Sequence, residues 1–477
     1  MTRAIAAITS GWLVLGTAGA TAQRPPAQAA GDVRYAPREN YAAGAEGSRN
    51  LRIQFHLPLT SATDIRLDQE LSRPYVYQPH GGPAGFHVID VKDPGRASII
   101  YSWSIDQPDL HVGRATGVML FKQRGRYYSV LSTQFGQQGP DNEVVAIVFD
   151  VTGLPDTSKV KEAARIRNAV NKGGSHEAFT YKHSDSRALF FTTVSGTPFA
   201  DIYDLAKVLA GGDTANGRVG RIPVPPVTRP DGRNAGTYHD MYVAYDPATH
   251  QDKFYGAGWQ DQPNSWNQLG YYVVYDVSRP EDPKLLATVA GVPGVSYAHT
   301  FMATPDGRYA VAESERQYDP LYLFDLKPGL DGTVKTISRP ISAWTPNWKN
   351  LVHQFEIRWP YVFAAGYADG LHIFNMMDPT NPYTVGYYDT YDGPIPVPPG
   401  PAGNWGDTEP IMQGNWGVDI RNADGLIVIS DERTGTWGFK MDGFDGRNGH
   451  QWGMPNVSSA QDWDNGPDGA PKTQKVS

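Results

Sequence analysis

The stretch Leu351–Thr390, LVHQFEIRWPYVFAAGYADGLHIFNMMDPTNPYTVGYYDT, predicts four short β-strands joined by tight turns. β-Branched and aromatic residues, which suit a pleated and half-buried surface, fill the segments HQFEI, YVFAAGY, LHIFNMM and YTVGYYDT. Proline, glycine and aspartate separate these segments at Arg358–Pro360, Ala368–Gly370 and Asp378–Pro382, where they favour reversals of the chain. An antiparallel unit of this length cannot bury both of its faces by itself, so we expect further copies to stack against it.

The same unit recurs along the chain at intervals of roughly 50–65 residues. The residues at which its first strand begins are called anchors below, and they are Thr63, Thr116, His176, His239, His299, His353 and Trp416. Repeated four-stranded units of this length are typical of a β-propeller, in which blades stack radially around a channel. The sequence therefore predicts an all-β, seven-bladed β-propeller built from four-stranded antiparallel blades.

The segment Leu51–Leu57 precedes the first anchor, whereas the last repeat ends near Lys440 without a clear fourth strand of its own. We expect Leu51–Leu57 to form the outer strand of blade seven and so to close the ring, because this pairing removes two unprotected sheet edges. The expected organisation is a signal peptide, a flexible lead-in, the propeller and a polar C-terminal tail, over residues 1–22, 23–50, 51–445 and 446–477.

The third strands and the last repeat resemble the LVIVD-repeat family of β-propellers. The third-strand motif is LHIFNM at Leu371–Met376, followed by D-P-x-x-P at Asp378–Pro382, and the closing stretch Gly414–Gly435 reads GNWGVDIRNADGLIVISDERTG. The resemblance covers roughly residues 50–445. It implies a propeller fold and an exported or surface location, as is typical of the bacterial and archaeal members. It implies no particular reaction.

The N-terminus has the layout of a secretory signal peptide. Arg3 precedes an apolar run, Ala4–Ala20, and small residues at Ala20–Ala22 form an A-x-A cleavage site. We therefore expect export to the periplasm or the medium. No later apolar segment is long enough to span a bilayer, so we expect no transmembrane segment in the mature chain.

The composition excludes several classes of function. The chain has no cysteine, which rules out thiol catalysis and thiolate metal ligands. Its formal net charge is −8 and no basic cluster is present, so a nucleic-acid partner is not expected. The motifs of zinc proteases, α/β-hydrolases and P-loop enzymes are absent, so the sequence assigns no catalytic residue and leaves open whether the chain is an enzyme.

Histidine at consecutive anchors indicates a metal site. Strand one is the innermost strand of a blade, so all anchors should meet at one mouth of the channel. Imidazole is a common ligand of transition metals, and the sequence predicts a divalent ion (Fe, Cu or Zn) held by His176, His239, His299 and His353. Glu177 and Asp240 are expected to accept hydrogen bonds from the rings. The alternative is a purely structural set of histidines that ties the blades together.

Further polar and aromatic residues should surround these histidines. The ends of the second strands lie on the same face, and with two further anchors they supply the expected pocket residues Glu313, Glu315, Arg316, Asp431, Glu432, Arg433, Thr116 and Trp416. Long connections at Val224–Tyr238, Gly256–Gly270 and Tyr391–Gln413 reach this face too. Loops on a rigid scaffold commonly carry binding residues. The expected ligand rim comprises Trp259, Trp266, Tyr367 and Trp405.

Three functions remain open from the sequence. The first is an exported propeller that binds a small molecule, an extracellular protein or a glycan at its histidine-lined mouth, with a divalent metal. The second is a metalloenzyme of the oxygenase, oxidase or lyase type. Carotenoid-cleaving oxygenases hold a metal on a propeller axis with four histidines, an arrangement similar in kind. The third is a surface interaction scaffold without metal.

Overall fold

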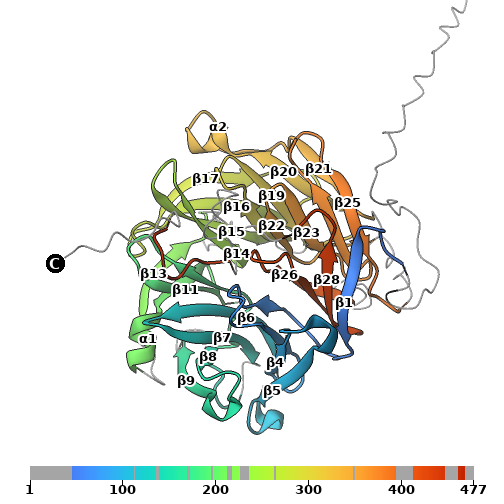
Figure 1. Cartoon of the computed structure of the whole chain (residues 1–477). Coiled ribbons are helices and arrows are strands. Elements are labelled where there is room, and N and C mark those ends of the chain that lie inside the picture. Colours follow the sequence, from blue (N-terminus) through green and yellow to red (C-terminus); the bar gives the residue numbers. More distant parts are fainter. Residues whose placement is uncertain are drawn as a thin grey trace, which may run out of the picture.

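The structure is a computed structural model. It describes residues 44, 46–111, 113–135, 139–168, 172–194, 197–211, 217–225, 236–262, 265–347, 350–393, 412–445 and 460–467, and the side chains of residues 261–268 are not described. Strands make up most of the described chain, and they form seven four-stranded antiparallel sheets arranged in a ring (Figure 1). This is the predicted seven-bladed β-propeller.

Each of the first six blades takes its four strands from consecutive chain segments. Blade one contains β2 (Arg66–Leu67), β3 (Tyr75–His80), β4 (Gly85–Asp90) and β5 (Ser98–Ser104), and blade two contains β6 (Gly113–Gln123), β7 (Arg126–Phe135), β8 (Val144–Asp150) and β9 (Lys161–Arg167). Blade three contains β10 (Ala178–Lys182), β11 (Ala188–Thr193), β12 (Phe199–Asp204) and β13 (Arg218–Pro223). Blade four contains β14 (Gly236–Asp246), β15 (Gln251–Gln262), β16 (Ser265–Asp276) and β17 (Lys284–Ala290).

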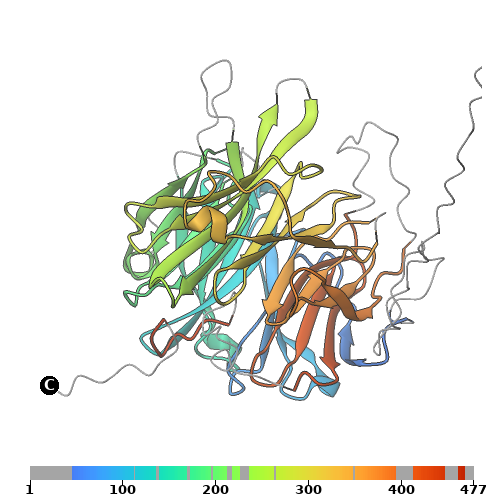
Figure 2. The same ribbon diagram turned by 90° about the horizontal axis from the view of Figure 1, so that it is seen from above.

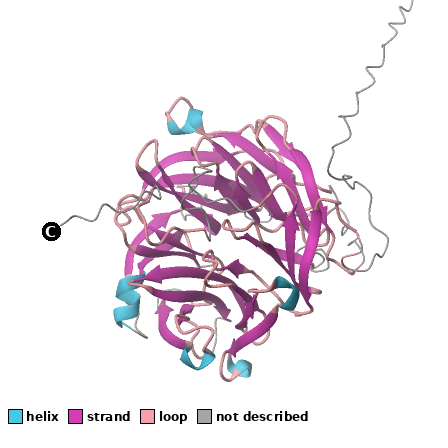
Figure 3. Cartoon of the chain, in the orientation of Figure 1, coloured by secondary structure: helices cyan, strands magenta, loops and turns pink. Residues whose placement is uncertain are grey.

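Blade five contains β18 (Ala298–Ala303), β19 (Tyr309–Ser314), β20 (Leu321–Asp325) and β21 (Ser342–Trp344), and blade six contains β22 (Phe355–Arg358), β23 (Tyr361–Ala365), β24 (Leu371–Asn375) and β25 (Tyr383–Tyr388). Short helices lie at the periphery of the ring (Figure 3). In the described residues they are α1 (Leu205–Gly211), α2 (Lys327–Leu330) and the 3₁₀ turns η1 (Pro94–Arg96), η2 (Pro108–Leu110) and η3 (Thr157–Lys159).

Blade seven combines both ends of the propeller sequence. Its strand order is β1 (Leu51–Leu57), β28 (Gly435–Met441), β27 (Ile427–Asp431) and β26 (Asn415–Ile420), so β1 is the outer strand (Figure 1). The pairing of β1 with β28 is antiparallel. Upstream of β1, Gly47 forms a bridge to Tyr388 at the end of β25. The described contacts of the N-terminal segment with the propeller therefore begin before Leu51.

A recurrent turn follows the third strand of the first six blades. The last side chain of that strand accepts a hydrogen bond from the backbone N–H two residues later, which is an Asx turn. The donor–acceptor distances lie between 2.7 and 3.1 Å, and the accepting residues are Asp90, Asp150, Asp204, Asp276, Asp325 and Asn375. This turn gives a local physical reason for the acidic or amide residue that ends each third-strand motif.

The core lies between the blades, where side chains from both faces of each sheet are buried. The largest cluster joins blades three to six and includes Tyr242, Tyr255, Phe301 and Phe324. Close packing of large side chains between neighbouring sheets fixes the angle of each blade, and thereby the position of its first strand at the channel.

Part of the C-terminal tail packs against the propeller. Trp463 meets the ring of Phe121 edge-on with 6.3 Å between centroids. The backbone N–H of Lys182 donates to the side chain of Gln461, and its ammonium donates to the carbonyl oxygens of Asp462 and Asn465. The other tryptophan of the tail, Trp452, lies outside the described residues.

One expected loop is a β-hairpin instead. Gly256–Gly270 was expected to be a connection, but β15 and β16 are each 12 residues long and pair as far as Gln262 and Ser265. The hairpin projects beyond its neighbours (Figure 2). Within the described chain, no helix is long and apolar enough to cross a membrane.

Candidate metal centre and ligand-binding mouth

The anchors of blades three to seven form a continuous run of ring contacts at one mouth of the channel. The centroids of His176 and His239 are 4.2 Å apart, and those of His239 and His299 are also 4.2 Å apart. His353 continues the run at 4.5 Å from His299 and 4.3 Å from the ring of Trp416. The structure therefore brings the four predicted histidines together.

β-Bulges explain how the first strands present these side chains. The pairing register shifts between Tyr238 and Met241 in β14 and between Ala298 and Phe301 in β18, so that His239 and His299 each occupy an irregular position. A bulge opposes two residues to one and re-aims the side chains involved. Thr116 and Trp416 lie at similar shifts in β6 and β26.

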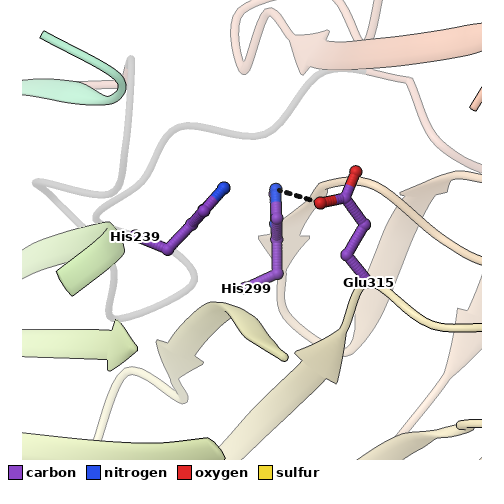
Figure 4. A group of neighbouring side chains, drawn as sticks. All are labelled: His239, His299 and Glu315. Carbon is purple, nitrogen blue, oxygen red and sulfur yellow. Dashed lines mark ion pairs between the residues drawn. The ribbon is translucent and has the colours of Figure 1, made fainter. Parts of the chain in front are cut away.

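The geometry selects two histidines and one carboxylate as the best metal-binding group. Ligand atoms of His239, His299 and Glu315 all lie within 4.8 Å of one another, and all three residues are buried (Figure 4). Glu315 follows β19, the second strand of blade five, and its Oε2 lies 3.8 Å from Nε2 of His299. The third member of the group is thus a carboxylate that was expected to line the pocket, and not a third histidine.

An unpartnered nitrogen atom fits a metal at this group. Nε2 of His299, the nitrogen nearer to Glu315 Oε2 in this pair, is buried and has no hydrogen-bond partner among the described residues. A buried polar atom without a partner is costly, and a metal ion would remove that cost. Nδ1 of His299 lies 2.9 Å from the hydroxyl oxygen of Thr300 and 3.2 Å from Oε2 of Glu313, so a proton on Nδ1 leaves the lone pair on Nε2.

The remaining two histidines lie beside this group. Nε2 of His176 is 2.7 Å from Nε2 of His239, so one of these two nitrogens donates to the other. Nδ1 of His353 lies 2.8 Å from the carbonyl oxygen of Trp416 and donates to it, while its Nε2 is 4.0 Å from Oε1 of Glu315. Both rings are therefore held by neighbours and border the group from either side.

Burial keeps the imidazoles neutral, as metal ligands must be. It lowers the pKa of His176 and of His353 to about 3, and it lowers the pKa of His239 and His299 well below the usual range, with neighbouring imidazoles adding to the effect. Burial also raises the pKa of Glu315 to about 7, opposed by the hydrogen bond from Tyr367 and by the charge of Arg114.

Glu177 and Asp240 do not take the role expected for them. Asp240 accepts a 2.9 Å hydrogen bond from the hydroxyl of Thr300, and no hydrogen bond links either carboxylate to a described histidine. Each directly follows an anchor, so its side chain leaves the strand in another direction. Burial raises the pKa of both carboxyls, that of Asp240 to about 7. Glu313, from the neighbouring second strand, lies beside His299 instead.

A cavity of about 640 Å³ opens at the metal-binding group. Its volume suits a small organic ligand. Its lining combines histidines, carboxyl groups and aromatic rings: Arg114, His176, His239, Tyr297, Glu315, His353, Tyr367, Met412, Gln413, Trp416 and Glu432. Sequence reasoning missed Arg114 and Tyr297, which precede the anchors Thr116 and His299 by two residues. That short distance from an anchor is the signal that would have found them.

Other expected pocket residues make contacts within the propeller itself. The hydroxyl of Thr116 lies 3.5 Å from the carbonyl oxygen of Ser175, at the limit of a hydrogen bond, and thereby faces blade three. Asp431 accepts a 3.0 Å hydrogen bond from Thr390, and burial raises its pKa to about 6. Arg433 pairs with Asp392 at 2.8 Å, outside the cavity lining.

The expected aromatic rim is present in part. Tyr367 lines the cavity, and Trp259 stacks on Tyr297 with 3.7 Å between centroids. Arg316 also contacts Tyr297, with its guanidinium carbon 5.7 Å from the ring centre. Trp405 lies outside the described residues, and Trp266 belongs to β16 but its side chain is not described.

These features define a seven-bladed β-propeller with a buried histidine and carboxylate group beside a cavity at one mouth of its channel. No protein-family model matches the chain, and comparison with curated proteins finds no significant relative.

Proposed function

We propose that this protein is an exported β-propeller that binds a small ligand at the histidine-lined mouth through a divalent transition metal. The observation that carries the proposal is the convergence of His239, His299 and Glu315 within 4.8 Å, all buried, with His239 and Glu315 lining a cavity. Imidazole and carboxylate ligands suit Fe, Cu and Zn better than Mg or Ca, because nitrogen donors favour the transition ions.

Three physical features support a metal over a purely structural set of histidines. The imidazoles are neutral because burial lowers their pKa, so no proton competes for the nitrogen lone pairs. Nε2 of His299 has no hydrogen-bond partner in the described chain. Tyr367 orients Glu315 through a 2.6 Å hydrogen bond, as residues behind metal ligands commonly do.

A metalloenzyme is the second candidate, and the donor set favours it specifically. Two histidines and one carboxylate with open positions are the ligands of non-haem Fe(II) oxygenases. Bound there, such an ion would supply oxygen or water activation next to the cavity. The residues of this chain would hold the ligand and limit the access of water, since His239, His299 and Glu315 are buried. An interaction scaffold without metal is the remaining alternative.

Elemental analysis of the purified protein tests the metal. We expect near-stoichiometric Fe, Cu or Zn in the wild type, and its loss in His299→Ala and Glu315→Gln. His250→Ala is the matched control, because His250 is exposed and hydrogen-bonded only to Tyr245 in the described structure. Absence of metal from the wild type, even after reconstitution, would refute both the metal-dependent binding protein and the metalloenzyme. The interaction scaffold without metal would then be the remaining function.

We also propose that the protein is exported. Two features support export: the signal-peptide pattern of residues 1–22 and the resemblance to LVIVD-repeat propellers. Cell fractionation followed by mass measurement checks this. We expect a protein that begins at Gln23 in the periplasm or the medium. Full-length protein retained in the cytoplasm would contradict export.

A further inference from the structure

Arg114 presents a guanidinium to the cavity without an anionic partner. It belongs to β6 and lines the same cavity as His176, His239, Glu315 and His353. Its guanidinium carbon lies 4.8 Å from the ring centre of Trp416, so a cation–π contact holds the side chain in place. In the described part of the chain, no hydrogen bond or ion pair to this side chain is found.

The acids of the cavity lining form no ion pair with Arg114 in the described chain. Glu315 and Glu432 line the cavity with Arg114, but neither carboxylate comes within ion-pair distance of it. The other rim arginine, Arg433, is occupied by Asp392. One guanidinium without an ion-pair partner among the described residues therefore faces the cavity.

We infer that the ligand of this mouth is a small organic carboxylate, whose anionic end pairs with Arg114 while its body contacts Tyr297, Tyr367 and Met412. The guanidinium fork matches a carboxylate bidentately. Arg114 is the only arginine or lysine in the described lining of the cavity, and one guanidinium suits a monoanion better than a phosphate dianion. The inference rests on the proposed function, since it names the ligand class of the same site.

The extent of the cavity supports this arrangement. Arg114 and Glu315 line one continuous cavity of about 640 Å³, which is large enough for a ligand that reaches both. Tyr297, Tyr367 and Met412 add apolar surface to the same lining. An amphiphilic carboxylate fits such a lining.

Calorimetric titration of the full-length, metal-loaded protein tests the inference with two matched pairs of probes, benzoate with benzamide and acetate with acetamide. We expect at least one carboxylate to bind about 10- to 100-fold more tightly than its neutral amide, as a charge-assisted pair implies. Arg114→Gln should abolish this preference, and Arg114→Lys should restore part of it. Arg308→Gln is the control, because Arg308 also stacks on a tyrosine but lies in blade five away from the cavity.

Each contrary result has a defined meaning. Equal binding of carboxylate and amide to the wild type would overturn the inference, and so would a preference that persists in Arg114→Gln or the absence of any carboxylate binding. The wild-type comparison needs no variant, so it remains decisive if Arg114→Gln fails to fold. A carboxylate preference in a protein that holds no metal would refute the proposed function and leave this inference standing. Bound metal in a protein that shows no carboxylate preference would refute this inference and leave the proposed function standing.

Discussion

The phenolic oxygen of Tyr367 donates a 2.6 Å hydrogen bond to Oε1 of Glu315, and both side chains are buried at the mouth of the channel. Tyr367 comes from blade six and Glu315 from blade five, so the contact also joins two blades. The backbone of Tyr367 has a φ of 42°, in the left-handed region that favours glycine. Strain of this kind persists where surrounding contacts hold a residue in place, and it is typical of functional sites.

Replacing Tyr367 by phenylalanine tests this contact. We expect Tyr367→Phe to fold normally and to bind metal about 10- to 100-fold more weakly, because Glu315 loses the group that orients it. Competition with a chelator of known affinity measures the change. Unaltered metal affinity would show that Glu315 does not depend on Tyr367 or is not a ligand.

The pairing of β1 with β28 is expected to hold the ring together. The ring of Phe55 is buried and covers Gly438, where an added Cβ would come within 2.1 Å of it. We expect Phe55→Ala to lower the free energy of unfolding by about 3–5 kcal/mol, as is usual for a buried phenylalanine. Ile53→Ala, at a more exposed position of the same strand, should have a much smaller effect.

A deletion of residues 23–60 extends this test to the whole strand. It exposes the edge of β28 and removes the outer strand of blade seven. Thermal melting should remain cooperative and shift to a much lower temperature. An unchanged melting temperature would show that β1 is dispensable for the ring.

The C-terminal segment 460–467 should stabilise blade three through Lys182. The Lys182 side chain is buried, and its ammonium donates to the carbonyl oxygens of Asp462 and Asn465. Removal of residues 460–477 takes away these acceptors and should cost about 1–3 kcal/mol in urea unfolding. The same truncation in a Lys182→Met background should cost less, because no charge is then left in need of acceptors. Equal losses in the two backgrounds would assign the effect to Trp463 packing instead.

Gly417 marks a position where the channel has no room for a side chain. A Cβ there would lie 2.9 Å from Oδ1 and 3.1 Å from Cα of Asp64, so the backbone of blade one would have to move. We expect Gly417→Ala to destabilise the protein by about 1–3 kcal/mol in chemical denaturation. Gly95→Ala is the control, since its nearest neighbour is a side-chain oxygen at 3.6 Å. Similar stability of the two variants would contradict this packing.

The number and type of the blades could be predicted because their signals are local. Strand-forming residues and turn residues alternate within each repeat, and the Asx turns after Asp90, Asp150 and Asp276 involve neighbours only two residues apart. The anchors could be predicted for the same reason, since each lies at or near the start of the first strand of its blade. Gly256–Gly270 was wrongly expected to be a connection, because Gly256, Gly258 and Gly270 are paired across the strands β15 and β16.

The membership of the site could be predicted only in part. Four histidines were placed at one mouth because a propeller brings its first strands together. Glu177 and Asp240 were given the wrong role because sequence adjacency says little about direction at a bulge, where the register changes. Glu315 and Arg114 lie beside residues that other blades supply. The sequence around each of them does not indicate which histidines lie close to it.

The sequence by itself determined the class of fold, the spacing of the blades and the clustering of histidines, because each depends on short-range periodicity. Only the tertiary structure decided that His239 and His299 share a centre with Glu315, and that Arg114 faces the same cavity. These relationships depend on the radius of the ring and on the direction of each side chain at the channel. Both are set by the packing of whole blades against one another, which no single segment encodes.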